Sequence, residues 1–182
     1  YPGRFHPFHK GHASVYNKLT QKFPYADVYV TTSGKIDPVK SPFTFDEKKT
    51  MMVAAGVDPD KVVEVASPYI AKEITDRYES DSTKIVYAVS QKDMEGPSAR
   101  FKFGLKKDGT PSYFQPFESV GESEYMSQHG YVDVLPTMNF EIEGSSVNMY
   151  KNASADERKK LILALYGSVD NKILDIFDAK LG

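Results

Sequence analysis

The chain has 182 residues, of which 40% are hydrophobic, and its formal net charge is −2. A chain of this size buries a core without covalent cross-links, and the lack of cysteine excludes disulfides, thiolate metal sites and thiol nucleophiles. The interspersed acids and bases argue against nucleic-acid binding. No apolar run approaches about 20 residues and no signal peptide is visible, so we expect a cytoplasmic protein without a membrane span.

The first ninety residues alternate helix and strand patterns at about the spacing of βαβ units. The last of these strands is apolar almost throughout, as strands buried on both faces of a parallel sheet are. This order predicts an α/β fold with a doubly wound, Rossmann-like parallel sheet. The predicted elements are helix 12–23, strand 27–32, helix 45–55, strand 61–66, helix 70–78 and strand 84–89.

Apolar residues mark one side of each of the first two predicted helices. We expect Gly56 to cap the second of them. The positions expected to be buried are Val15, Leu19 and Phe23 in the first helix and Met51, Met52 and Ala55 in the second.

The second half of the chain begins with a stretch in which the alternation breaks down. Residues 97–136 are rich in aromatics, glycine and proline, and Lys107-Asp108-Gly109 predicts a hairpin turn. We interpret this stretch as an ordered insertion, because a solvated linker would not carry so many aromatics. A strand at 139–142 and helices at 155–166 and 169–181 follow. We therefore expect one domain over 1–182, with the insertion at 97–136 and C-terminal helices within 154–182.

The sequence begins at Tyr1 with its most informative segment two residues later. A phosphate-binding loop normally follows a strand, so we expect that the first strand is cut short and that the true N-terminus precedes Tyr1.

This N-terminal segment has the physical features of an anion-binding loop. Gly3 leaves room for the main chain to approach a phosphate closely, and Gly11-His12 opens a helix whose free N–H groups favour an anion. His9 and His12 are three residues apart, so both imidazoles can face one phosphate group and donate hydrogen bonds to it. Two alternatives are surface or capping histidines, and a zinc site formed by His6, His9 and His12.

The same segment resembles the nucleotidyltransferase superfamily. The resemblance implies nucleotide binding by Gly3, Arg4, Phe5 and Gly11 and catalysis by His9 and His12. It covers residues 3 to about 153, and Arg4 narrows it to the archaeal-type nicotinamide mononucleotide adenylyltransferases. The positions that fit the pattern G-x-F-x-P-x-H-x-G-H are Gly3, Phe5, Pro7, His9, Gly11 and His12.

A second stretch, Thr32-Ser33 followed by Ser41 to Lys48, resembles that family's small residues and N-P-F-T-x-x-E-R segment, with Ser41 for the Asn and Lys48 for the Arg. It also fits a capping box from Thr44 and Glu47, and both interpretations can hold together. Several further stretches resemble nucleotidyltransferase-like proteins of tailed bacteriophages. They are residues 67–69, 92–94 and 106–115.

A third stretch, residues 142–148, resembles the superfamily's late I-S-x-T-x-[IV]-R motif, which grips the ATP phosphates. Ser145 keeps a hydroxyl, and Ser146 and Asn148 complete the expected nucleotide contacts. Glu143 and Asn148 replace a Ser and an Arg, and both changes weaken phosphate binding. Lys151 is the cation that could compensate. A plain strand-to-helix turn with a Ser cap is the alternative.

Three further features have plainer explanations as well. Asp93 follows the apolar strand 84–89 where the superfamily often has a polar residue near the nucleotide, but a surface turn explains it equally. His129 has no spacing partner and we interpret it as structural. The aromatics of 101–131 could stack on a base, although packing is the commoner reason for such density.

Two functions remain open at this stage. The first is an adenylyltransferase that moves AMP from ATP, with Mg²⁺, to a small phosphorylated acceptor such as nicotinamide mononucleotide; Ser33, Lys48, Asp93 and Lys151 would lie on the acceptor or phosphate side. No protein metal ligands are expected. The second is a weakened or inactive domain that serves as a structural or binding component, for example of a phage particle in a host cytoplasm or virion. A homo-oligomer or a larger viral assembly fits either.

Overall fold

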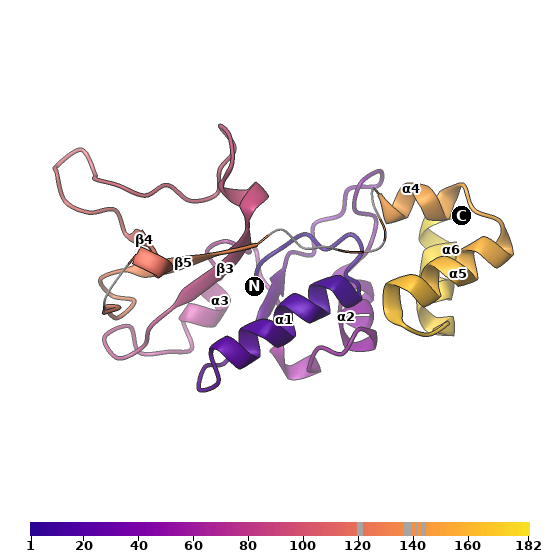
Figure 1. Cartoon of the computed structure of the whole chain (residues 1–182), viewed down its shortest axis with the longest axis horizontal. Coiled ribbons are helices and arrows are strands. Elements are labelled where there is room, and N and C mark those ends of the chain that lie inside the picture. The colour runs from indigo at the N-terminus through magenta and orange to yellow at the C-terminus, as the bar shows by residue number, and fades with distance from the viewer. Residues whose placement is uncertain (120–121, 137–139, 141, 143–144) are drawn as a thin grey trace. The chain divides into compact units, whose positions relative to one another are not determined.

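The computed structural model describes the whole chain except residues 120–121, 137–139, 141 and 143–144 (Figure 1). It is a mixed α/β structure with parallel sheets, as the sequence predicts. Its residues group into two compact units. The first unit comprises Tyr1–Pro2 and Ser67–Thr137, and the second comprises Gly3–Ala66 and Met138–Gly182. The expectation of a single domain stays a prediction.

The second unit contains a short parallel sheet and most of the helices. Strands β1 and β2 pair in parallel, with Val30 opposite Val62, and each is only three residues long, shorter than predicted. The elements of this unit are α1 (Lys10–Lys22), β1 (Val30–Thr32), α2 (Phe45–Ala54), the 3₁₀ helix η1 (Pro59–Lys61), β2 (Val62–Glu64), α4 (Ser146–Lys151), α5 (Ala155–Tyr166) and α6 (Asn171–Leu181).

The buried side of α1 differs from the prediction. Leu19 is buried as expected, but Ala13 and Tyr16 are buried with it, while Val15 and Phe23 are only half-buried. Tyr16 can be buried because its hydroxyl donates to the carbonyl of Val28, 3.2 Å away, which satisfies the polar group that the apolar pattern excludes.

The buried side of α2 differs at one position. Met51 and Met52 are buried as predicted, but Lys48 is buried in place of the half-buried Ala55. Gly56 follows the helix with a φ of 107°, the left-handed conformation expected of a capping glycine.

The C-terminal helices α4, α5 and α6 gather into one cluster (Figure 1). Helix α5 has the predicted bounds and begins with a capping box from Ser154 and Glu157. It ends at Gly167, whose φ is 78°. Helix α6 begins two residues later than predicted because Asp170 is its N-cap and accepts from two main-chain N–H groups. Phe177 of α6 is fully buried in this cluster.

The first unit is built on a parallel sheet of order β3-β5-β4. The central strand β5 and its neighbour β4 lie in the stretch interpreted as an ordered insertion, where the sequence analysis named only a hairpin turn. Helix 70–78 is shortened to one turn, α3. The elements are α3 (Lys72–Thr75), β3 (Val86–Ser90), the 3₁₀ helices η2 (Gln91–Met94) and η3 (Phe117–Ser119), β4 (Phe114–Pro116) and β5 (Gly130–Leu135).

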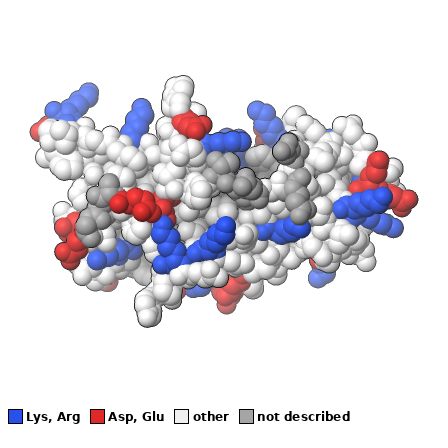
Figure 2. All heavy atoms as spheres, viewed as in Figure 1, with Lys and Arg blue, Asp and Glu red and all other residues white. Residues whose placement is uncertain are grey.

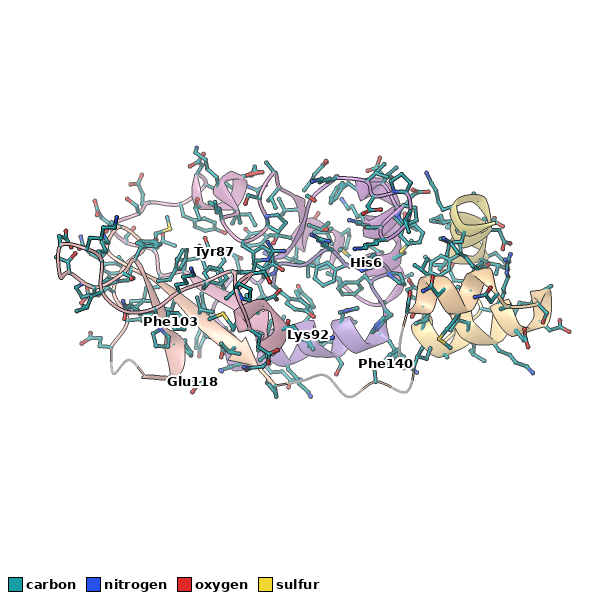
Figure 3. The ribbon with its side chains drawn as sticks, turned by 90° about the horizontal axis from the view of Figure 1, so that it is seen from above. His6, Tyr87, Lys92, Phe103, Glu118 and Phe140 are labelled. Carbon is teal, nitrogen blue, oxygen red and sulfur yellow. The ribbon has the colours of Figure 1, made fainter. Side chains whose placement is uncertain are left out.

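The aromatics of the predicted insertion mainly pack against this sheet. Phe101 is buried with Tyr87, Val89 and Val132, and its ring lies 4.7 Å from that of Phe114 (Tyr87 is labelled in Figure 3). The predicted turn is present, since the N–H of Lys106 donates to the carbonyl of Thr110 and Gly109 has a φ of 85°. The predicted strand 139–142 falls largely outside the described residues.

Acidic and basic side chains are both scattered over the face shown in Figure 2. Across the part of the chain that the structure describes, every helix is too short or too polar to cross a bilayer.

Candidate phosphate-binding site

The N-terminal loop follows a short extended segment that bonds to β1. The N–H of Gly3 donates to the carbonyl of Thr31, at 3.1 Å. Phe5 has a φ of 50°, a conformation that L-residues adopt at a cost, and its buried ring folds back over Gly3. A Cβ atom at Gly3 would lie 2.6 Å from this ring. The ring of Phe5 is therefore one reason for glycine here, in addition to the expected approach of a phosphate.

His9 and His12 form a reciprocal capping box at the start of α1. Nδ1 of His9 accepts from the N–H of Gly11 at 3.0 Å, and Nδ1 of His12 accepts from the N–H of His9 at 3.2 Å. Because both Nδ1 atoms accept, each neutral ring carries its proton on Nε2. The main chain thus fixes the tautomer of both imidazoles and leaves two Nε2–H groups as donors. The capping interpretation is confirmed, and a catalytic role for the two histidines stays a prediction.

Aromatic rings surround this pair. The ring of His9 stacks on Phe140 with centroids 4.2 Å apart and an interplanar angle of 7°, and it lies 3.9 Å from the ring of His12, which is tilted by 36°. Phe5 and Phe8 lie against His12 at 5.3 and 5.2 Å (Phe140 is labelled in Figure 3). The imidazoles are therefore held by packing on their faces as well as by hydrogen bonds at Nδ1.

Burial lowers the pKa of His9 to about 4. The pKa of His12 is lowered to about 3, mainly by burial and then by the nearby imidazoles of His9 and His6. Both rings are thus neutral at pH 7, and they stay neutral at mildly acidic pH, where an unperturbed imidazole is protonated. They can donate to an anion as neutral N–H groups in a dry setting, where such bonds are strong.

Two predicted site residues, Ser33 and Lys48, lie together behind this loop. Nζ of Lys48 donates to the carbonyl of Ser33 at 3.4 Å, and the side chain of Lys48 is only 1% exposed. Burial, and then the charge of Arg4, lower the pKa of Lys48. Partial burial and then Lys48 and Arg4 also lower the pKa of His6. Arg4 and Lys48 therefore form a cationic cluster beside the loop, with the imidazole of His6 next to both and the carboxylate of Asp37 close enough to interact with Arg4 and His6.

The segment that carries Lys48 begins with the predicted capping box. Oγ1 of Thr44 accepts from the N–H of Glu47, whose carboxylate accepts from the N–H of Thr44. Ser41 is buried, and its Oγ has no hydrogen-bond partner among the residues that the structure describes. A buried hydroxyl of this kind calls for a partner, and a bound polar group could supply it.

The late motif begins α4, as the sequence predicts. Oγ of Ser145 accepts from the N–H of Asn148 at 3.3 Å, so the alternative of a Ser-capped turn is confirmed. Ser146 is buried, whereas Asn148 and Lys151 are exposed. Glu143 lies outside the described residues. A nucleotide role for these side chains stays a prediction.

Asp93 belongs to the first unit, where it closes the turn after β3. Its carboxylate accepts from the N–H and hydroxyl of Ser90 and from the hydroxyl of Tyr69, at 3.0 to 3.3 Å. The guanidinium of Arg100 lies over the ring of Tyr69. These bonds explain Asp93 as a turn residue. His129, in the same unit, bonds through Nδ1 to the carbonyl of Tyr113.

Phe140 and Lys10 were not among the expected site residues. Lys10 lies 5.9 Å from the ring of Phe140, which covers His9. In the sequence, the one indication that Phe140 could lie at the site is that it stands five residues before Ser145. Lys10 occupies a variable position of the loop pattern. Neither signal separates these side chains from ordinary ones.

Comparison with known proteins agrees with this geometry at the level of the family. A family model described as cytidylyltransferase-like matches residues 1–103. A search of curated proteins and a search of solved structures each gave no match.

Proposed function

Because the chain belongs to the cytidylyltransferase-like family, we propose that it is a nucleotidyltransferase that moves AMP from ATP to a phosphate-bearing acceptor. Nicotinamide mononucleotide is the acceptor that the sequence favours, through Arg4 and the Ser-Pro-Phe-Thr segment. The observation that carries the proposal is the imidazole capping box, which presents two neutral Nε2–H donors at the N-terminus of α1.

In the proposed reaction an oxygen of the acceptor's phosphate attacks the α-phosphorus of ATP. A new P–O bond forms, the bond from the α-phosphorus to the bridging oxygen breaks, and pyrophosphate leaves with that electron pair. The protein has to align the two phosphates and stabilise the charge on their oxygens. His9 and His12 would donate to the α-phosphate and the leaving pyrophosphate, and Gly3, Phe5 and Gly11 would shape the loop around them.

The cationic cluster is well suited to the second phosphate. Arg4 and Lys48 approach one another although like charges repel, and Lys48 is buried with a single 3.4 Å hydrogen bond to Ser33 among the described contacts. A buried cation costs free energy unless an anion compensates it. A bound phosphate is such an anion, and Ser41 could complete its hydrogen bonds. Ser145, Ser146, Asn148 and Lys151 would lie along the ATP phosphates.

Magnesium would accompany the triphosphate. The described residues offer no group of three acidic or histidine side chains that could hold a metal ion, so the ion would be held by phosphate oxygens and water. Its chemistry would be to neutralise the negative charge that builds on the triphosphate.

The test is pyrophosphate release from Mg-ATP with a panel of phosphorylated acceptors, repeated with CTP, GTP and UTP to identify the donor. His9→Asn and His12→Asn should each lower the rate by about 10²–10³. His129→Asn is the matched control, because His129 is a half-buried histidine of the other unit. No release with any pair of substrates, together with unchanged thermal stability in each nucleotide, would overturn the proposal.

A second candidate is the weakened module, a binding or structural component such as part of a phage particle. The observation that favours it is Asn148, an uncharged and exposed residue in the first turn of α4, where the superfamily has an Arg. Asn148→Arg distinguishes the two. If Asn148→Arg raises a weak rate of pyrophosphate release tenfold, the site is a decayed active site. If the wild type and the variant both bind nucleotide without turnover, and the protein is isolated as part of a large particle, the chain is a binding or structural component.

A further inference from the structure

The phosphate loop is held by a residue 158 positions away in the sequence. The hydroxyl of Tyr166, the last residue of α5, donates to the main-chain carbonyl of Phe8 at 2.6 Å. Both residues are buried, with Phe8 fully so and Tyr166 7% exposed. Phe8 directly precedes His9, so this bond fixes the peptide that leads into the imidazole capping box.

The ring of Tyr166 is itself fixed by the C-terminal helices. It packs edge-on against Phe177 of α6 at 6.4 Å. Phe177 also packs against Phe43, which precedes α2, and against Tyr150 of α4, at 5.4 and 5.0 Å. Phe177 therefore connects Tyr166, which supports the loop, to the segment before α2 and to α4. Both of these segments carry predicted phosphate contacts.

A further set of polar contacts fixes α4 against the same helices. The hydroxyl of Tyr150 donates to Oδ1 of Asp178 at 2.6 Å, and Arg158 donates to the same oxygen at 3.0 Å. The guanidinium of Arg158 also lies over the ring of Tyr150 and donates to its carbonyl. Helix α4 is thereby tied through Tyr150 to α5 and α6, as the loop is through Tyr166.

We propose that Tyr166 is a positioning residue that holds His9 in its donor geometry, and that α5 and α6 are the rigid support of the phosphate site. The expected effect of Tyr166 on the reaction rate rests on the proposed function. Residues 155–181 lie beyond the part of the chain that the family model matches, so the support is a feature of this chain's own C-terminal region. Rate depends steeply on placement, since a displacement of about 1 Å can cost 10²-fold.

The test compares two substitutions that each remove one buried hydroxyl. Tyr166→Phe removes the donor to Phe8, and Tyr16→Phe removes the donor from α1 to Val28. Tyr166→Phe should lower kcat by about 10- to 100-fold with a smaller change in KM, whereas Tyr16→Phe should change neither by more than about twofold.

A readout that needs no turnover separates this inference from the proposed function. The ¹⁵N chemical shifts of the His9 and His12 rings report which nitrogen carries the proton and what it bonds. Tyr166→Phe should move these shifts and Tyr16→Phe should leave them in place. Shifts that stay at wild-type values in Tyr166→Phe would overturn the inference even if the wild type is an active enzyme. Shifts that move in a protein without pyrophosphate release would support it while the proposed function fails.

Hydrogen exchange of the unmodified protein provides a measurement that does not depend on the variant's folding. The amides of Gly11 and Ala13 bond to His9, and that of Gly167 closes α5 on Leu163. If α5 supports the loop, these amides should be exposed in one cooperative opening with equal free energy. Protection of Gly167 under conditions in which Gly11 and Ala13 exchange freely would contradict the support.

Discussion

At the scale of single residues, the two loop histidines are set apart by their neutrality. Burial holds the pKa of His9 at about 4 and that of His12 at about 3, whereas both would titrate near 6.5 in the unfolded chain. Below pH 6.5 the unfolded state therefore binds protons that the folded state does not, and the free energy of unfolding falls as the pH is lowered.

This neutrality predicts a measurable loss of stability in mild acid. Between pH 7 and pH 5 each imidazole should lower the free energy of unfolding by about 1–2 kcal/mol, which urea titrations at the two pH values would measure. His9→Asn keeps a capping side chain but cannot titrate, so it should remove about half of this loss. A variant with the full wild-type pH dependence would show that His9 is not the buried group responsible.

Lys48 is a buried cation whose charge is expected to lower the free energy of unfolding. Lys48→Met keeps the length of the side chain and removes the buried charge, so it should raise the free energy of unfolding by about 1 kcal/mol. The same change should raise the KM for the acceptor about 10- to 100-fold, since a hydrogen bond to a charged group is worth about 1.5–3 kcal/mol. Urea titration and steady-state kinetics measure the two effects.

The control for Lys48 is its half-buried neighbour Lys49. Lys49→Met should change stability and KM by much less. A Lys48→Met protein that is destabilised, or whose KM is unchanged, would count against a phosphate-binding role and favour a purely structural lysine.

At the scale of elements, the turn between α5 and α6 is fixed by Gly167. Its φ of 78° is left-handed, and a Cβ added there would meet no atom within 4 Å. The cost of Gly167→Ala is therefore that of the backbone conformation alone, about 1–2 kcal/mol. Thermal or chemical unfolding should show this loss, with a smaller loss for Gly167→Asn because Asn tolerates this conformation. Equal stability of all three would show that the turn relaxes at no cost.

Elements with clear local signals could be predicted from the sequence, and those whose pattern is interrupted could not. Helix α5 has the bounds predicted for it, and the structure shows the local signals behind them: Ser154 and Glu157 cap its start and Gly167 its end. Strand β5 was missed because buried Asp133 interrupts its apolar pattern, whereas its partner β3, some forty residues away, was predicted because it is apolar almost throughout. A chain segment whose partner is distant carries no local record of the pairing.

Some features of the candidate site could likewise be predicted from the sequence, and others could not. The spacing of His9 and His12 placed both at one helix start, as the structure confirms. The pattern could not indicate which nitrogen carries each proton, because that depends on main-chain hydrogen bonds of the folded loop. It also gave no sign of Phe140 or of the hydroxyl of Tyr166, whose contacts with the loop span most of the chain.

At the scale of the whole molecule, a bound nucleotide should stabilise the folded protein. At a concentration of Mg-ATP 100 times its Kd the free energy of unfolding rises by about 2.7 kcal/mol. For a chain of this length that corresponds to a rise in Tm of roughly 5–10 °C. Differential scanning calorimetry with Mg-ATP measures it, and MgCl₂ alone is the control. A Tm that responds to neither ATP nor another nucleoside triphosphate would contradict nucleotide binding.

The imidazole capping box has one more consequence, for the tolerance of the protein to transition metals. A histidine binds zinc or nickel through a nitrogen that has lost its proton. Here Nε2 could do so only if the proton moved to Nδ1, where it would confront the N–H groups of Gly11 and His9. The loop should therefore resist these ions by its own main-chain bonds. Added Zn²⁺ is expected to leave the ring signals of His9 and His12 unmoved while it shifts those of His129, whose Nδ1 rather than Nε2 is bonded to a main-chain group, the carbonyl of Tyr113.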